Sequence, residues 1–158
     1  MIEEEQAVLK IRNSLAGVFN LQLDKIDSEN LCLRLTDDDV SLFDFSDPIK
    51  NKKIFALIYS TMTAQGQVAS KPTSLISIYC SLFWVLNQAK EGVNFKQSVR
   101  YRSALVSATS SMWDSVLKGR RVEMAVLDTT DIGQYNSDNF LMASVQLQTY
   151  VDPVRIYK

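Results

Sequence analysis

The feature that most constrains the fold is a helical spacing of apolar side chains in two parts of the chain. Residues 3–20 carry such a stripe behind an acidic first turn, as amphipathic helices do. Its members are Ala7, Val8, Ile11, Leu15, Val18 and Phe19. A longer helix is expected from Asn94 to Lys118, with Gly119 as its C-terminal cap. Its apolar stripe comprises Tyr101, Leu105, Ala108, Met112 and Val116.

Two more helices are expected from their start signals. Asp47-Pro48 combines an N-cap residue with a first-turn proline, which predicts a helix running to about Gln65. Pro72-Thr73-Ser74 is a similar start, and the apolar run through Phe83 and Trp84 predicts a helix that stops near Gly92.

Extended structure is expected in fewer places. The alternating run 31–35 and the run 40–45 predict a small β-hairpin, 122–127 has no clear type, and 140–151 reads as an extended segment. The predicted fold is therefore mainly α with minor β, a four-helix bundle with a small β-hairpin. Residues 1–158 are expected to form a single domain, with a bundle core at about 3–118 and an extended segment at about 120–158.

Charge is sorted into blocks along the chain. Residues 1–47 hold eleven acidic and four basic residues, 50–121 hold eleven basic and two acidic, and 122–158 hold five acidic and two basic. The net charge is nevertheless only −1. Such a segregated field is typical of proteins that bind a polyanion or assemble with copies of themselves.

The composition argues against an enzyme, a metal site and a cofactor. The chain has no histidine, which removes the commonest general base and metal ligand. Cys32 and Cys80 have no CxxC spacing, so we interpret them as buried thiols in a reducing compartment. Asp128-Thr-Thr-Asp131 is interpreted as a loop with capping aspartates, because no nucleophile or base accompanies it. The glycines form no phosphate-binding loop.

The N-terminal segment Met1-Ile2-Glu3-Glu4-Glu5 is acidic, which is unlike a signal or transit peptide. The most apolar stretch, Leu75 to Leu86, is about twelve residues long and too short to span a bilayer. We therefore expect an intracellular protein that is neither secreted nor bound to a membrane.

A basic set around the last predicted helix is the strongest binding candidate. Cations on a rigid helix beside small hydroxyls suit the binding of phosphate groups, and arginine grips phosphate oxygens in pairs. The candidate RNA-binding residues are Lys96, Arg100, Arg102, Ser103, Lys118, Arg120 and Arg121. The alternative is that these are ordinary solvated cations, with Lys118 complementing the helix C-terminus.

The acidic triplet Asp37, Asp38 and Asp39 permits two interpretations. It lacks the spacing and glycine of an EF-hand loop, so an aspartate-rich turn is one explanation. In an assembly, the same carboxylates facing those of a neighbour could act as a repulsive switch that loosens contacts as pH rises.

Near the C-terminus, Tyr135 and Phe140 are separated by four residues, with Asn136 after the tyrosine and Gly133 before it. This pattern, followed by Val145, Leu147 and Tyr150, resembles the coat proteins of rod-shaped, tobacco mosaic-like plant RNA viruses. Leu141 stands where that family usually has an acid, and the closing tryptophan of the family is absent.

The resemblance implies a structural coat subunit that assembles helically on single-stranded RNA with little sequence preference. Arg100 and Arg102 would contact phosphates, while Tyr135, Asn136 and Phe140 would serve packing and assembly. The protein would then occur in the virion and in the host cytoplasm, with itself and RNA as partners and no small-molecule substrate.

A second hypothesis is a small intracellular adaptor or secretion chaperone that binds a protein partner and no nucleic acid. It depends on the amphipathic N-terminal helix followed by the alternating run Leu31-Cys32-Leu33-Arg34-Leu35. Large, salt-sensitive oligomers would favour the coat hypothesis, whereas a stable dimer indifferent to nucleic acid would favour the adaptor.

Overall fold

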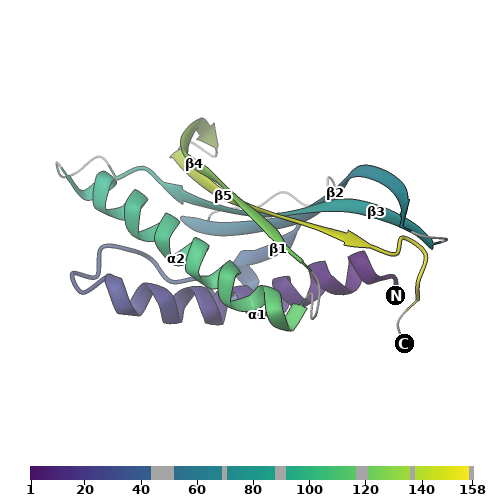
Figure 1. Cartoon of the computed structure of the whole chain (residues 1–158). Coiled ribbons are helices and arrows are strands. Elements are labelled where there is room, and N and C mark those ends of the chain that lie inside the picture. The colour runs from purple at the N-terminus through teal and green to yellow at the C-terminus, as the bar shows by residue number, and fades with distance from the viewer. Residues whose placement is uncertain (44–51, 69–70, 88–91, 117–120, 136–137, 157–158) are drawn as a thin grey trace.

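The computed structural model describes residues 1–43, 52–68, 71–87, 92–116, 121–135 and 138–156 (Figure 1). The elements follow in the order α1 (Glu3–Ile26), the 3-10 helix η1 (Asp37–Asp39), β1 (Val40–Leu42), β2 (Ile54–Val68), β3 (Lys71–Val85), α2 (Val93–Val116), β4 (Glu123–Tyr135) and β5 (Asp138–Val151). Two long helices and a five-stranded sheet thus replace the predicted four-helix bundle, which is wrong.

The sheet has the strand order β1-β2-β3-β5-β4. β2 and β3 form one long antiparallel hairpin, β4 and β5 form another, and antiparallel pairing of β3 with β5 joins the two hairpins. β1 is short and runs parallel to β2. Both helices lie on one face of the sheet, α1 against β1 and β2, and α2 against β3, β5 and β4 (Figure 1).

Both helices with a clear amphipathic stripe are confirmed. α1 begins at Glu3 as predicted and continues to Ile26, beyond the expected end. α2 begins at Val93, and its predicted cap Gly119 lies outside the described residues. Within the described chain, neither helix offers a membrane-spanning length of apolar residues.

The two helices predicted from proline-containing start signals are wrong where the structure describes them. Residues 54–65 of the helix predicted from Asp47 to Gln65 lie in β2. Residues 72–85 of the helix predicted to stop near Gly92 lie in β3. Asp47-Pro48 itself lies outside the described residues. β2 and β3 are rich in Ile, Ser, Thr and aromatic residues, which fit a pleated surface better than a helix.

The predicted hairpin of 31–35 with 40–45 is also wrong. Val40–Leu42 is a strand, but it pairs in parallel with Ala56–Ile58, while 31–35 is extended without belonging to the sheet. The expected loop at Asp128–Asp131 lies within β4, where the register with β5 is irregular. The extended segment predicted at 140–151 is confirmed as most of β5.

The main core lies between the sheet and the two helices. Ile11, Leu15 and Phe19 project from α1, and Tyr101 projects from α2 to stack on Phe19 with ring centroids 6.4 Å apart. Below them β3 contributes every second residue, namely Ile76, Ile78, Cys80, Leu82 and Trp84, all buried. Full burial of an aliphatic or aromatic side chain is worth about 1.5–3 kcal/mol, so this layer dominates stability.

The opposite, helix-free face of the sheet is built from the alternate residues. Cross-strand ring pairs cover it, with Tyr59 stacked on Tyr79 and Phe55 stacked on Phe83, each pair at a centroid distance of 4.8 Å. Phe140 packs against Phe55 at 5.5 Å and is buried. β2 contains no charged residue at all, and β3 and β5 contain one each.

Candidate partner-binding groove

Two of the cations predicted to bind RNA, Lys96 and Arg100 on α2, are engaged in ion pairs. Arg100 is only 16% exposed, and its guanidinium binds Asp27 at 2.9 Å and also Glu29. Lys96 binds the same Glu29 at 3.0 Å. Hydrogen bonds from Arg100 and then Lys96 lower the pKa of Glu29, so this carboxylate stays ionised and, together with Asp27, offsets the charges of both cations.

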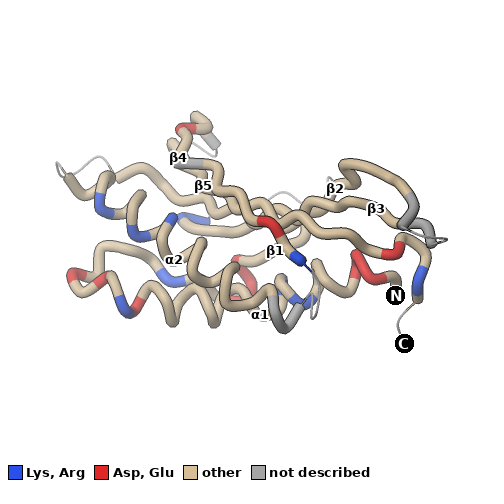
Figure 2. Tube along the Cα trace, viewed as in Figure 1, with Lys and Arg blue, Asp and Glu red and all other residues tan. Residues whose placement is uncertain are grey.

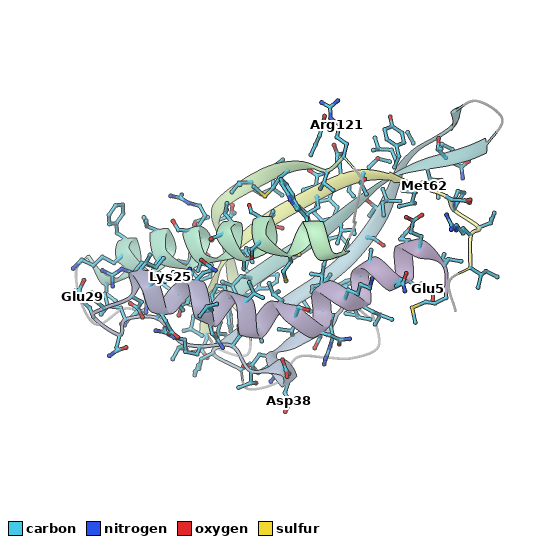
Figure 3. All side chains as sticks on the ribbon, turned by 60° about the horizontal axis from the view of Figure 1, so that its bottom comes forward. Glu5, Lys25, Glu29, Asp38, Met62 and Arg121 are labelled. Carbon is cyan, nitrogen blue, oxygen red and sulfur yellow. The ribbon has the colours of Figure 1, made fainter. Side chains whose placement is uncertain are left out.

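Of the remaining members of the predicted RNA-binding set, the described ones, Arg102, Ser103 and Arg121, are not gathered beside Arg100. Arg102 lies two residues farther along α2, on another side of the helix, and is half-buried, while Ser103 is exposed. Arg121 is 90% exposed, 3.6 Å from Glu123, and lies far from Glu29 in Figure 3. Lys118 and Arg120 lie outside the described residues.

The blocks of charge in the sequence meet within one molecule. Besides the pairs made by Lys96 and Arg100, the basic middle block contributes Lys52, which binds Asp39 at 2.7 Å, and Lys53, which binds Asp138 at 2.6 Å. Each pair joins the basic block to an acidic block. Figure 2 shows basic positions of α2 close to acidic positions at the end of α1, while the long strands are almost free of charge.

The residues that carry the coat-protein resemblance surround the turn between β4 and β5. Tyr135 is paired with Asp138 across the hairpin, and Asn136 lies outside the described residues. Phe140 is 1% exposed and belongs to the aromatic cluster on the helix-free face. The pattern thus spans a hairpin, and it does not follow the last helix of a bundle.

The acidic triplet forms η1, a single 3-10 turn. Asp39 closes a capping box with Thr36 and binds Lys52. Partial burial alone would raise the pKa of Asp39, but the hydrogen bonds from Lys52 and Thr36 outweigh burial and lower it. Across the described residues, no three Cys, Asp or Glu side chains are arranged to hold a metal ion.

The polar centre that sequence reasoning missed is Asp27, at the end of α1. Its side chain is fully buried and accepts hydrogen bonds from the backbone N–H groups of Leu31 and Cys32, each at 3.0 Å. Arg34 and Arg100 add charged donors at 3.1 and 2.9 Å. Burial alone would raise the pKa of Asp27, but these four donors together lower it.

Side chains, not a neighbouring strand, hold the extended segment 31–35. Gln97 donates to the carbonyl of Leu31 at 2.6 Å, and the Tyr101 hydroxyl accepts the N–H of Leu33 at 2.7 Å. Asn20 bonds both backbone groups of Leu35, at 2.9 and 2.7 Å. With Asp27, these contacts attach the segment to both helices.

A groove separates this segment from the start of β2 and the end of β3. It is shallow and open to solvent, has a volume of about 650 Å³, and is lined by Leu31, Leu33, Lys53, Val85, Leu86, Asn87 and Gln97. Leu33 is 48% exposed, so the groove offers apolar surface to solvent. The rim residue Lys53 is held by Asp138.

Gln97 gives the groove a specific polar feature. Its side chain is 8% exposed, and no donor among the described residues reaches its Oε1 atom. A buried acceptor without a donor costs about 1–3 kcal/mol. Because this atom has almost no surface of its own in the groove, a ligand N–H group would pair with it only after the Gln97 side chain turned toward the groove. Apolar walls with few polar groups are typical of binding sites.

The described residues that line the groove include no cysteine, serine, threonine or acidic residue. The nearest thiol, Cys32, is buried, and burial with the neighbouring Asp27 charge raises its pKa to about 12. The thiol is therefore protonated at neutral pH, and a protonated thiol is a poor nucleophile.

Comparison with protein-family models gives no match, and comparison with curated protein sequences gives no significant match.

Proposed function

We propose that the protein is a partner-binding module, an adaptor or chaperone that holds an extended apolar segment of another polypeptide in the groove beside 31–35. The observation that carries the proposal is the groove's apolar lining, with Leu33 48% exposed, beside Gln97, whose Oε1 has no donor among the described residues. A peptide segment supplies both requirements, since it combines apolar side chains with backbone N–H donors.

The charges of the described residues support a protein partner over RNA. Phosphate contacts need accessible cations, whereas Lys96 and Arg100 are paired with carboxylates. The coat-protein hypothesis also derived part of its support from the four-helix architecture, which the structure contradicts. RNA binding stays a prediction, which a titration with labelled oligouridine tests.

The first experiment selects binders for the full chain from a phage-displayed library of random peptides and measures the affinity of one synthetic, fluorescein-labelled peptide. The Leu33→Glu variant should weaken binding about tenfold or more, because burial of a leucine side chain contributes about 1.5–3 kcal/mol. Leu21→Glu is the matched control, since Leu21 is 58% exposed on α1 and does not line the groove.

A labelled oligouridine, titrated at low and moderate salt, tests the alternative. Tight, strongly salt-dependent binding of oligouridine, together with no selected peptide that responds to Leu33→Glu, would overturn the proposal in favour of RNA. Equal losses in the Leu33→Glu and Leu21→Glu variants would also count against the groove.

A further inference from the structure

The outer edge of β4 is an open sheet edge of a kind that monomeric proteins usually protect. β4 is the last strand of the sheet, and no described strand pairs with its second side. Its first part, Glu123–Leu127, keeps an unbroken register with β5 before the irregularities begin. An open edge exposes a row of backbone N–H and C=O groups that can pair with another strand.

This regular stretch lacks the usual protection of an edge. It contains no proline and no lysine, and its one charged residue is Glu123. Val126 is 43% exposed and Leu127 is 46% exposed, on opposite faces of the sheet. Proteins normally blunt such edges with charges, prolines or bulges, and here the bulges follow only after Leu127.

The order of charges along β4 favours a second copy of the same chain as the partner. Arg121, 90% exposed, comes before the stretch, and Asp131, also exposed, comes after it. In a two-fold antiparallel pair, the basic end of one strand lies beside the acidic end of the other. A parallel pair would place like charges together. Figure 3 shows Arg121 projecting away from the body of the protein.

We infer that two copies of the protein pair through antiparallel β4 edges, centred on Ala125, to form one continuous sheet across a two-fold dimer. Ala125 is the middle residue of Glu123–Leu127, so only this centre uses the whole regular stretch. Met124 of one copy would then lie opposite Val126 of the other on the helix-covered face. The inference is independent of the proposed groove, whose lining residues include none from β4.

The register is tested with the Ala125→Cys variant of the full chain. Directly opposed residues in antiparallel strands have Cα atoms about 4.5–5.5 Å apart, within the range of a disulfide. Mild oxidation should therefore give a covalent dimer. Cys32 and Cys80 are buried and should not compete. Met62→Cys on the β2–β3 hairpin, 46% exposed, is the matched control and should stay monomeric on non-reducing gels.

The interface itself is tested by sedimentation velocity of the unmodified chain and of Leu127→Glu, because this register places residue 127 of one copy opposite Glu123 of the other. The unmodified chain should be dimeric, and Leu127→Glu should raise the dimer dissociation constant about tenfold or more, since it removes apolar burial and sets like charges against each other. Met62→Glu, at the same 46% exposure, should leave it unchanged. Circular dichroism of each variant checks that it is folded.

Exchange of the two end charges tests the antiparallel order. Arg121→Glu alone should weaken the dimer, and Arg121→Glu with Asp131→Arg should restore part of it. Because Asp131 also accepts the N–H of Gly133, Asp131→Asn serves as a control for that turn. A monomer at all concentrations, or a dimer that neither cross-links at Ala125→Cys nor responds to Leu127→Glu, would overturn the inference.

Discussion

The side chains on the two faces of the sheet are covered in different ways. On the helix-covered face, Ile76, Ile78 and Leu82 are completely buried beneath α1 and α2. On the helix-free face, which has no second layer among the described residues, neighbouring side chains cover one another. Tyr59 stacks on Tyr79, and Ser81 bonds Ser144 at 2.7 Å. Apolar content alone therefore does not distinguish the face that packs against a second layer from the face that does not.

The largest difference in unfolding free energy between the two faces is expected for substitutions at adjacent residues of β3, which point to opposite faces. Ile78→Ala should lower the free energy of unfolding by about 2–5 kcal/mol, because it leaves a cavity under the helices. Tyr79→Ala should cost less, since Tyr79 is only partly buried and its stacking on Tyr59 adds about 0.5–1.5 kcal/mol to that partial burial. Urea denaturation of both variants measures the contrast. Equal losses of unfolding free energy would show that side chains on both faces contribute similarly to stability.

The polar groups near the two faces should differ in how their contribution to the free energy of unfolding depends on pH. Asp27, beside the covered face, has a pKa below its ordinary value of 3.8. As pH falls through this range, the unfolded chain binds the proton first, so the free energy of unfolding should decrease. Asp27→Asn places an amide NH₂ group against N–H donors and should cost about 1.5–3 kcal/mol at neutral pH.

Denaturant titrations between acidic and neutral pH measure this prediction. The pH dependence of stability should be smaller in Asp27→Asn than in the unmodified chain. A variant with the same acid dependence would show that other carboxylates govern it, such as Glu29, whose pKa is also lowered.

The smallest effect is expected from the neutral polar pair on the helix-free face. Ser144 is 2% exposed and bonds Ser81, so Ser144→Ala should cost about 1 kcal/mol, the usual net worth of one hydrogen bond. Neither hydroxyl titrates, so the loss should be the same at acidic and neutral pH. A loss that changes with pH would contradict a purely neutral network.

The elements predicted correctly are those whose spacing has one interpretation. α1 and α2 each have an apolar stripe on one side and small or charged residues on the other, which a strand cannot use. The first half of β2 is apolar on both faces, so it shows no alternation, whereas in β3 the apolar residues Ile76, Ile78, Cys80 and Leu82 alternate with the polar-tipped residues Ser77, Tyr79 and Ser81. That alternation is a strand signal that the helix prediction for this segment left unused. The composition of both strands, rich in Ile, Tyr, Ser and Thr, was a further signal that could have identified them.

The sequence indicates the candidate groove only in part. The alternating run 31–35 supports the adaptor hypothesis, but its alternation predicts a strand of a hairpin. Its actual partners, Asn20, Gln97 and Tyr101, lie on the two helices. Gln97 and Tyr101 are more than sixty positions away from it in sequence. Such side-chain contacts leave no periodic pattern, so sequence spacing could not reveal them.

The sequence by itself determined the two amphipathic helices, the extended C-terminal segment and the opposite charges of the blocks, because these follow from local spacing and composition. Only the tertiary structure decided that the blocks pair within one molecule, as in Arg100 with Asp27. It also decided that β5 lies between β3 and β4, leaving β4 at the edge. The physical reason is that a long-range contact depends on which surfaces are buried together, and one segment of sequence records only its own half of that contact.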